Sequence, residues 1–420
     1  MRSNRLTMWI VVALLLGIAS GYVVNAQFGD SSARFAEIVE LLPTAFLRLI
    51  KMIIAPLVFA TLVVGIGKMS DLAMLGRVGA KSLGWFIFAS LISLTFGLVL
   101  VQLFAPGAVM QLPLPEENAA ANVEASALSL QGFITHTIPT SIIDAMARNE
   151  ILQIVVFSVF FGTATAALGE RGKIVLDALD AVAHIMLKVT GYVMMAAPLA
   201  VFGALAGTIA KQGLGIVWVY GLFIGEFYIA LAILWVVLVV LGWFIVGPSI
   251  LRLMRRIREP VLLAFSTASS EAAYPKTLEE LERFGISNRV ASFVLPTGYS
   301  FNLDGSMMYC TFAIMFIAQV YGIELSITQQ IVMVAILMLT SKGIAGVPRA
   351  SLVVIAATLP QFNIPEAGLL LLIGVDQFFD MGRSATNVVG NSVATAVVAK
   401  WEGELGPDGG IGTKNLEMKS

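Results

Sequence analysis

Residues 214–247 read LGIVWVYGLFIGEFYIALAILWVVLVVLGWFIVG, an apolar run with a single charged residue, Glu226. An α-helix needs about 20 consecutive apolar residues to cross a hydrocarbon core of roughly 30 Å, so this run is long enough to span a membrane. Further apolar blocks predict helices at residues 7–25, 42–66, 81–104, 138–168 and 177–209. The block at 138–168 is less uniform, which indicates a broken helix. The sequence therefore predicts an all-α integral membrane protein.

Composition argues against other classes of protein. Of the 420 residues, 58% are hydrophobic and 13% are charged, whereas soluble domains have about 45–50% apolar and about 25% charged residues. A net charge of −1 and a pI near 6.2 give no reason to expect nucleic-acid binding. The one cysteine, Cys310, excludes an intramolecular disulfide, and His136 and His184 lack the spacing of metal ligands. We therefore expect no cofactor and no resident metal.

The N-terminus admits two interpretations. Residues 1–5 are basic, residues 8–19 are apolar, and Val-Asn-Ala at 24–26 resembles a signal-peptide cleavage site. The apolar stretch nevertheless reaches Val24, which is long enough to span, and many further spans follow. We interpret it as the first transmembrane helix.

Basic residues are distributed unevenly among the connections. They occur at the start of the chain and after the second, fourth and sixth spans, as Arg2, Arg5, Lys68, Arg77, Lys81, Arg171, Lys173, Arg252, Arg255, Arg256 and Arg258. The long connection 106–135 contains no lysine or arginine. Because cytoplasmic loops carry the excess of Lys and Arg, we expect both termini in the cytoplasm and residues 106–135 outside.

After Pro260 the chain contains the first of two similar units. Its apolar residues 261–275 become small and polar at 266–273, which read STASSEAA. This stretch is too short and too polar in its middle to span the membrane. A charged, helix-like segment at 276–289 follows. The next apolar run is interrupted at 296–298 (PTG) and 302–305 (NLDG).

The second unit repeats this order. Apolar residues 328–341 lead into GIAGVPRAS at 343–351, a second apolar limb runs to Leu359, and a helix with polar residues follows. Non-helical backbone at membrane depth is tolerated only where protein buries it or a watery cavity faces it. Two such segments at corresponding positions predict a substrate site between inverted repeats. The alternative is two amphipathic surface hairpins.

Polar residues in the last helix form one stripe. Asp376, Asp380, Arg383, Asn387 and Asn391 are spaced 4, 3, 4 and 4 residues apart, which places them on one face of a helix. Ionisable residues in a span cost roughly 2.5–3.5 kcal/mol each, so they indicate a binding face or a pathway. The alternative is an Asp380–Arg383 pair at i,i+3 that only neutralises itself. That pair would leave Asp376, Asn387 and Asn391 unexplained.

The residue types in this stripe suit an acidic amino acid. A guanidinium binds carboxylate through two parallel hydrogen bonds, so Arg383 would take the side-chain carboxylate. Asp380 would accept from the ammonium, and Asn387 would bond the ammonium or the main carboxylate. The backbone N–H groups of the hairpin tips and the hydroxyls of Ser269 and Ser270 would take the remaining carboxylate.

Several motifs together carry a resemblance to a known family. They are FLRLIKM (46–52), PLVF (56–59), NEILQIV (149–155), SSE (269–271), NLDG (302–305), SKGIAGVP (341–348), DMGR (380–383) and NVVG (387–390). Over nearly its whole length the chain resembles the dicarboxylate/amino acid:cation symporter family, which includes the glutamate transporters. It looks closest to the bacterial glutamate/aspartate symporters.

The resemblance implies a fold and an assembly. It implies eight transmembrane helices, two re-entrant helical hairpins, inverted repeats, an elevator-type mechanism and a homotrimer in a bacterial inner membrane. Residues 1–250 would be mainly scaffold and trimerisation helices, with the third and sixth helices joining the transport domain. Residues 251–405 would form the transport core, with hairpin 1, helix 7, hairpin 2 and helix 8. Residues 406–420 would be a cytoplasmic tail.

The resemblance also implies a role for individual residues. The substrate-binding set is Ser269, Ser270, Val347, Asp380, Arg383, Ser384 and Asn387, and the cation-binding set is Ser90, Gly298, Ser300, Asn302, Asp304, Asn387 and Asn391. Arg349 would be a gate residue. Departures from the family pattern concern mainly the cation sites, at Asn391, Leu303, Phe86 and Ala89, with a further one at Arg349. The family's C4-dicarboxylate carriers lack an aspartate at the position of Asp380.

We therefore expect a secondary active symporter of glutamate or aspartate, driven by Na⁺ and/or H⁺, and no enzymatic activity. Its partners would be the small anionic substrate, membrane lipid and two further copies of the chain. The alternatives are a C4-dicarboxylate symporter and a passive anion channel. An intramembrane aspartyl hydrolase would need two carboxylates that face each other across helices, whereas Asp376 and Asp380 share one helix.

Overall fold

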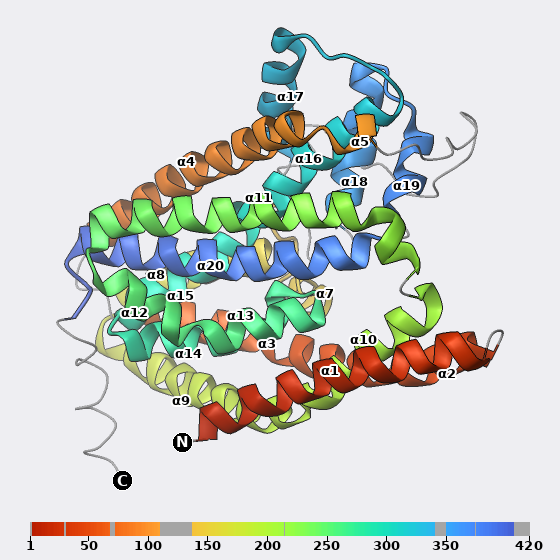
Figure 1. The fold of residues 1–420 in the computed structure, drawn as a ribbon. Helices are drawn as coiled ribbons and strands as arrows, with labels where there is room; N and C mark the ends of the chain where they lie inside the picture. Colours follow the sequence, from red (N-terminus) through yellow and green to blue (C-terminus); the bar gives the residue numbers. More distant parts are fainter. Residues whose placement is uncertain are drawn as a thin grey trace.

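The computed structural model describes residues 2–28, 31–67, 72–109, 137–213, 215–340, 350–373 and 375–406. Within these ranges the regular structure is helical (Figure 1), and the one β-type contact is an isolated bridge between Ile286 and Leu405. Six helical stretches in the described part are long and apolar enough to cross a membrane: Met8–Gln27, Ser32–Gly67, Ala73–Val109, Glu170–Lys211, Tyr220–Val246 and Asn288–Val320. The prediction of an all-α, multi-pass membrane protein is confirmed.

The first part of the chain contains several long helices with shorter ones between them. They are α1 (Arg2–Phe28), α2 (Ser31–Val39), α3 (Leu41–Gly67), α4 (Leu72–Phe104), α5 (Pro106–Val109), α7 (Ile142–Arg148), α8 (Ile151–Ala167), α9 (Glu170–Val193), η1 (Met194–Ala196), α10 (Ala197–Gln212) and α11 (Gly215–Val246). The predicted break within 138–168 is confirmed. It lies at Asn149, whose left-handed backbone (φ 55°) ends α7; asparagine is among the residues that adopt this conformation most readily.

The second part contains shorter helices and one long final helix. They are α12 (Ser249–Arg256), α13 (Arg258–Thr267), α14 (Ser270–Phe284), α15 (Asn288–Phe301), α16 (Asp304–Val320), α17 (Ile327–Thr340), α18 (Ala350–Thr358), η2 (Leu359–Phe362), η3 (Glu366–Leu369), α19 (Leu370–Ile373) and α20 (Asp376–Glu402). The predicted second tip at 343–351 falls largely outside the described residues.

Two predicted boundaries in this part are wrong. Residues 276–289 are not one helical piece, because Gly285 adopts φ 108° and ends α14. Residues 296–298 do not interrupt the helix, because α15 continues through Pro296 to Phe301. A proline removes one backbone donor, and α15 accommodates that loss.

Helix α20 lies at the centre of the bundle. In Figure 1 it runs beside α11, and α13, α14, α15 and α16 also pack against it. From Met381 to Ala399 every side chain is buried. Because this buried helix carries charged and amide side chains, their polar atoms need partners on the surrounding helices.

The end of α20 is tied to two other elements. Glu402 forms ion pairs with Lys81 (2.6 Å) and Arg77 (3.6 Å) of α4, and Lys81 also donates to the carbonyl of Trp401 at 3.0 Å. After α20, the bridge between Ile286 and Leu405 joins the chain to the connection between α14 and α15. These contacts fix the position of α20 along its own axis relative to the helices that form the site.

Candidate functional site

The turn between α13 and α14 contains the serines that the sequence places at a hairpin tip. Ala268 adopts a left-handed conformation (φ 50°) that ends α13, and Ser269 is the N-cap of α14. The hydroxyl oxygen of Ser269 accepts from the backbone N–H of Ala272 at 3.2 Å. Ser270 begins α14, and backbone N–H groups in the first turn of a helix have no acceptor inside that helix. Both limbs of this hairpin pack against α20.

The path from α15 to α16 is interrupted at Asn302 and Leu303, whose backbones are not helical (ψ 61° and 66°). Asn387 of α20 bonds the first turn of α16. Its Oδ1 accepts from the backbone N–H groups of Gly305 (2.9 Å) and Ser306 (3.3 Å), and its Nδ2 donates to Ser306 Oγ at 3.2 Å. Asn387 therefore caps α16 from the neighbouring helix and holds the interruption in place.

The carboxylate of Asp304 is fully buried beside this interruption. Ser93 Oγ of α4 donates to its Oδ1 at 3.0 Å, and Asn302 Nδ2 donates to its Oδ2 at 2.9 Å. The same Asn302 Nδ2 lies 3.5 Å from Oδ1 of Asn391 on α20. Side chains from α4, the α15–α16 connection and α20 thus converge around one carboxylate.

Two polar atoms of this cluster, Asn302 Oδ1 and Asn391 Nδ2, are buried without a hydrogen-bond partner among the described residues. Leaving a buried donor or acceptor unsatisfied costs about 1–3 kcal/mol. Amide and carboxylate oxygens are the ligands that hard cations take in proteins. The described residues contain no group of three or more His, Cys, Asp and Glu side chains that would hold a metal ion. The oxygen atoms of Asn302 and Asp304 are of the kind that binds a hard cation.

Two glycines allow the helices around Asp304 to approach closely. A Cβ at Gly390 of α20 would overlap the Asp304 carboxylate, and a Cβ at Gly298 of α15 would overlap Oδ1 of Asn391. Both glycines lie inside helices, where glycine costs about 1 kcal/mol relative to alanine. Glycine is required at both positions because the buried polar groups occupy the space that a side chain would fill.

Arg383 contacts Asp380 and Tyr309 and lies one helical turn before Asn387. Its Nε donates to Asp380 Oδ1 at 2.7 Å, and Ser384 Oγ donates to the same oxygen at 3.2 Å. The guanidinium lies over the ring of Tyr309 at 5.3 Å, and the Tyr309 hydroxyl donates to Asp376 Oδ1 at 3.0 Å. Arg383 Nη1 is buried and has no acceptor among the described residues. This N–H group is available to an anionic ligand.

The remaining predicted residues lie as follows. Ser90 Oγ donates to the carbonyl of Phe301 at 3.4 Å, and the carbonyl of Gly298 accepts from the backbone N–H of Asn302 at 2.7 Å. Ser300 is buried in the last turn of α15. Val347 and the gate candidate Arg349 lie outside the described residues. The structure brings Asn302, Asp304, Asn387 and Asn391 together.

Sequence reasoning missed three residues of the site: Ser93, Ser306 and Tyr309. Ser93 follows Ser90 by three residues and so shares its helix face, which was the available signal. Ser306 and Tyr309 come after Asp304 in a largely apolar helix. Their contacts with Asn387 and Asp376 of α20 depend on how α16 packs, which no local pattern reveals.

Comparison with known proteins identifies relatives that match nearly the whole chain. A protein of Polaromonas naphthalenivorans named C4-dicarboxylate transport protein 2 is 40% identical over 403 residues, which is 94% of this chain and 90% of the relative. Proteins named C4-dicarboxylate transport protein are 42% identical in Rhizobium etli (94% of this chain, 90% of the relative) and 38% identical in Bacillus subtilis (96% and 94%).

These relatives contradict the expected preference for glutamate or aspartate. The expectation that Asp380 separates this chain from C4-dicarboxylate carriers is wrong on the same ground, since relatives with that name match almost the whole chain. The structure supplies a physical reason. Asp380 Oδ1 already bonds Arg383 Nε and the Ser384 hydroxyl, which is the internal i,i+3 pair that the sequence left as an alternative to an ammonium site.

The transporter family itself was predicted correctly. The family model described as the sodium:dicarboxylate symporter family matches residues 6–401. This match extends from the first turns of α1 to Trp401 in α20 and includes the buried polar residues of the site. The chain belongs to the sodium:dicarboxylate symporter family.

Proposed function

We propose that this protein is a C4-dicarboxylate symporter driven by a cation gradient. The observation that carries the proposal is the buried Nη1 of Arg383, which has no acceptor among the described residues. A guanidinium N–H in a low-dielectric site is a strong partner for a carboxylate. The names of relatives about 40% identical over nearly the full chain support a four-carbon dicarboxylate as the ligand.

The second carboxylate of such a substrate needs its own donors. We assign it to the first turn of α14, where Ser270 offers a hydroxyl and the backbone N–H groups have no intrahelical acceptor. A helix N-terminus also carries a partial positive charge that favours an anion. The packing of α13 and α14 against α20 supports this assignment, because it brings the hairpin to the helix that carries Arg383.

Charge balance is the physical reason for cation coupling. Asp304, Asp376 and Asp380 are set against one guanidinium, Arg383, so the site has two excess negative charges when all three carboxylates are ionised. A dicarboxylate adds two more. Uncompensated charges of one sign are very costly in a buried site. Binding of the dianion therefore requires cations to enter with it.

We place one coupling cation beside Asp304. The unpartnered Oδ1 of Asn302 supports this position, and Ser93, Ser90 and Asn391 bring further oxygen atoms close to it. Oxygen ligands suit Na⁺, whereas protonation of Asp304 would serve H⁺ coupling at the same place. The coupling cation is thus Na⁺ or H⁺.

We further propose the family architecture for the whole chain. It comprises eight spans and two re-entrant hairpins, α13–α14 and α17–α18, with residues 1–250 mainly as scaffold and 251–405 as the transport core of an elevator. Two helix pairs, each followed by a helix with buried polar residues, support the inverted repeat. The protein would be a homotrimer in a bacterial inner membrane with both termini in the cytoplasm.

Uptake into proteoliposomes tests the proposed function. Purified protein is reconstituted, and radiolabelled succinate uptake is measured with an inward Na⁺ gradient, an inward H⁺ gradient, or neither. A symporter accumulates succinate above the outside concentration with at least one gradient. A passive anion channel only equilibrates it. Equilibration without accumulation under both gradients would contradict the proposal.

A further inference from the structure

Glu226 is the single charged residue in the span of α11, and the site described above does not use it. The span extends over Tyr220–Val246, so Glu226 lies about 9 Å along the helix from its first residue. On one side of Glu226, Ile229 is 54% exposed, whereas Phe223 and Phe227 on the other side are fully buried. Glu226 therefore lies at the boundary between the lipid-facing and the buried face of α11.

Hydrogen bonds fix the level of Glu226 relative to α20. Tyr228 Oη donates to the carbonyl of Phe378 at 2.7 Å, and Trp235 Nε1 donates to Thr386 Oγ1 at 2.8 Å. Residue numbers rise in the same direction along both helices, so α11 and α20 are parallel. Glu226 therefore lies level with the first turn of α20, where the polar stripe of the site begins.

One carboxylate oxygen of Glu226, Oε2, is buried and has no hydrogen-bond partner among the described residues. The titratable groups at this level are Tyr220 and Tyr228 on α11, Tyr309 on α16, and Asp376, Asp380 and Arg383 on α20. Of the other helices packed against α11, α5 has no titratable side chain, the charged residues of α4 pair with the far end of α20, and α12 follows the opposite end of α11. The cation at this level, Arg383, is paired with Asp380. An ionised Glu226 would thus lack a cation of its own among the described residues.

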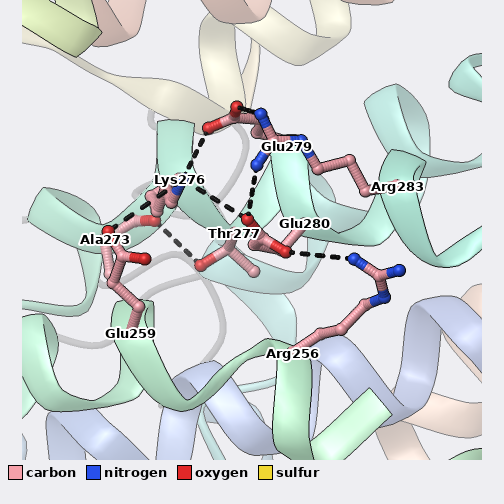
Figure 2. Close-up of polar contacts among 8 residues, drawn as sticks. All are labelled: Arg256, Glu259, Ala273, Lys276, Thr277, Glu279, Glu280 and Arg283. Carbon is pink, nitrogen blue, oxygen red and sulfur yellow. Dashed lines mark hydrogen bonds and ion pairs between the residues drawn. The ribbon is translucent and has the colours of Figure 1, made fainter. Parts of the chain in front are cut away.

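Glu280, a buried glutamate of α14, shows the contrast. In Figure 2 it lies 3.3 Å from Lys276 and 3.0 Å from Arg283, and Arg256 of α12 adds a contact at 3.8 Å. These cations hold the Glu280 carboxylate in its ionised form. Without such a partner, an ionised carboxylate inside a span is costly. The surroundings of Glu226 therefore favour the neutral, protonated carboxyl group.

We propose that Glu226 is a proton-binding site that carries one proton into the cell with each dicarboxylate. The proposal rests on the proposed function and adds to it a coupling site separate from the one at Asp304. Basic residues after α11 place that end in the cytoplasm, so Glu226 lies near the outer end of its span. The carboxylate takes one proton from the outer water. The neutral acid releases that proton to the inner water after α11 has moved with the transport core, and no other bond changes.

Charge links the proton to the substrate. One monovalent cation at Asp304 offsets only half of a dianion, so a further positive charge is needed. A bound dicarboxylate adds negative charge at the level of Glu226, which favours the protonated carboxyl group. Release of the dicarboxylate removes this charge and favours loss of the proton. Because such coupling is reciprocal, protonation of Glu226 strengthens dicarboxylate binding by the same factor.

The number of protons carried with each succinate tests this proposal. In proteoliposomes with zero membrane potential and equal Na⁺ on both sides, the logarithm of the equilibrium accumulation ratio of the succinate dianion is plotted against the pH difference. Each proton carried adds one to the slope. Glu226→Gln should therefore lower the slope by one, which is about a 10-fold loss of accumulation per pH unit. Glu226→Asp keeps a carboxyl group and should keep the slope, as should Glu324→Gln at an exposed position outside the described spans.

Chemical labelling reports proton binding without transport. Dicyclohexylcarbodiimide adds to protonated carboxyl groups in apolar surroundings, so peptide mass spectrometry at neutral pH should find its adduct at Glu226 and not at Glu324. If Glu226→Gln does not fold, this labelling decides, and absence of the adduct at Glu226 overturns the proposal.

The outcomes separate this proposal from the proposed function. An unchanged slope in Glu226→Gln would overturn the role of Glu226, with Glu226 then a carboxyl group that keeps its proton throughout transport. Accumulation of succinate by the unmodified protein on a Na⁺ gradient, with zero slope against the pH difference, would also overturn it and leave the proposed function intact. Absence of accumulation with either gradient would contradict the proposed function and the coupling role of Glu226 together.

Discussion

At the scale of single residues, the hydrogen bonds of Asp380 determine which charged groups of a substrate the site can bind. Its Oδ1 takes hydrogen bonds from both Arg383 Nε and the Ser384 hydroxyl. A carboxylate used in this way orients the guanidinium and offsets its charge. An ammonium on the substrate would compete with Arg383 for it. A substrate with two carboxylates and no ammonium leaves the pair intact.

Arg383 is expected to provide most of the binding free energy for one substrate carboxylate. Replacing it by glutamine, Arg383→Gln, removes the charge and the buried N–H group. Loss of one partner of a buried charge pair costs about 2–5 kcal/mol, so succinate affinity should fall roughly 30- to several-thousand-fold. Equilibrium binding to purified protein measures it. Arg148→Gln is the control, because Arg148 forms an exposed pair with Asp144 and should leave affinity unchanged.

Tyr309 is expected to act as a positioning residue for Arg383. Tyr309→Phe keeps the ring beneath the guanidinium and removes only the hydrogen bond to Asp376. One hydrogen bond is worth about 1 kcal/mol, so succinate affinity should fall about 5-fold. Tyr192→Phe, at an exposed position, is the control. If the two variants bind succinate equally well, the Tyr309–Asp376 contact has no part in placing Arg383.

At the scale of elements, close approach between α20 and its neighbours depends on glycine. A Cβ added by Gly390→Ala would overlap the carboxylate of Asp304. Overpacking costs about 1–3 kcal/mol, so this variant should unfold at a lower temperature and depend less steeply on the coupling cation. Gly84→Ala in α4 is the matched control, because nothing lies within 4 Å of its Cβ position. Equal thermal stability of both variants would argue against this packing.

The interrupted helix shows how far the sequence predicts an element. Asn302 and Asp304 mark the interruption correctly, since the helix breaks at Asn302 and Leu303 and resumes at Asp304. Pro296 suggests a break that does not occur, since α15 passes through it. The difference lies in tertiary contacts. Asn387 caps α16 from another helix, whereas the missing N–H of Pro296 costs one hydrogen bond inside α15.

At the scale of the whole molecule, the arrangement of charges predicts the orientation in the membrane. In a Cys310→Ser background, Val109→Cys should react with an impermeant maleimide in intact cells, while Arg255→Cys should react only after permeabilisation. Both positions are exposed at the protein surface, so reactivity reports the side of the membrane. Strong labelling of position 255 from outside would contradict an orientation with cytoplasmic basic connections.

The sequence predicts the membrane class and the polar stripe of α20, because composition and period carry that information, while its motifs carry the resemblance to the family. It does not predict the substrate. Residue types favoured Asp380 as an acceptor for an ammonium over its i,i+3 pair with Arg383, and the side-chain geometry shows that pair, with Ser384 as a second donor. Likewise, the convergence of Ser93, Asn302 and Asn391 on Asp304 depends on packing between elements distant in the sequence.

The central claim is that the site accepts a dicarboxylate and that, among the described residues, Asp380 pairs with Arg383 and Ser384 rather than with an ammonium. Competition against radiolabelled succinate uptake tests it most directly, because L-aspartate differs from succinate only by its amino group. An ammonium buried without its own partner costs at least about 1–3 kcal/mol, so unlabelled succinate should compete about 5- to 150-fold better than L-aspartate. Tighter competition by L-aspartate than by succinate would contradict the account.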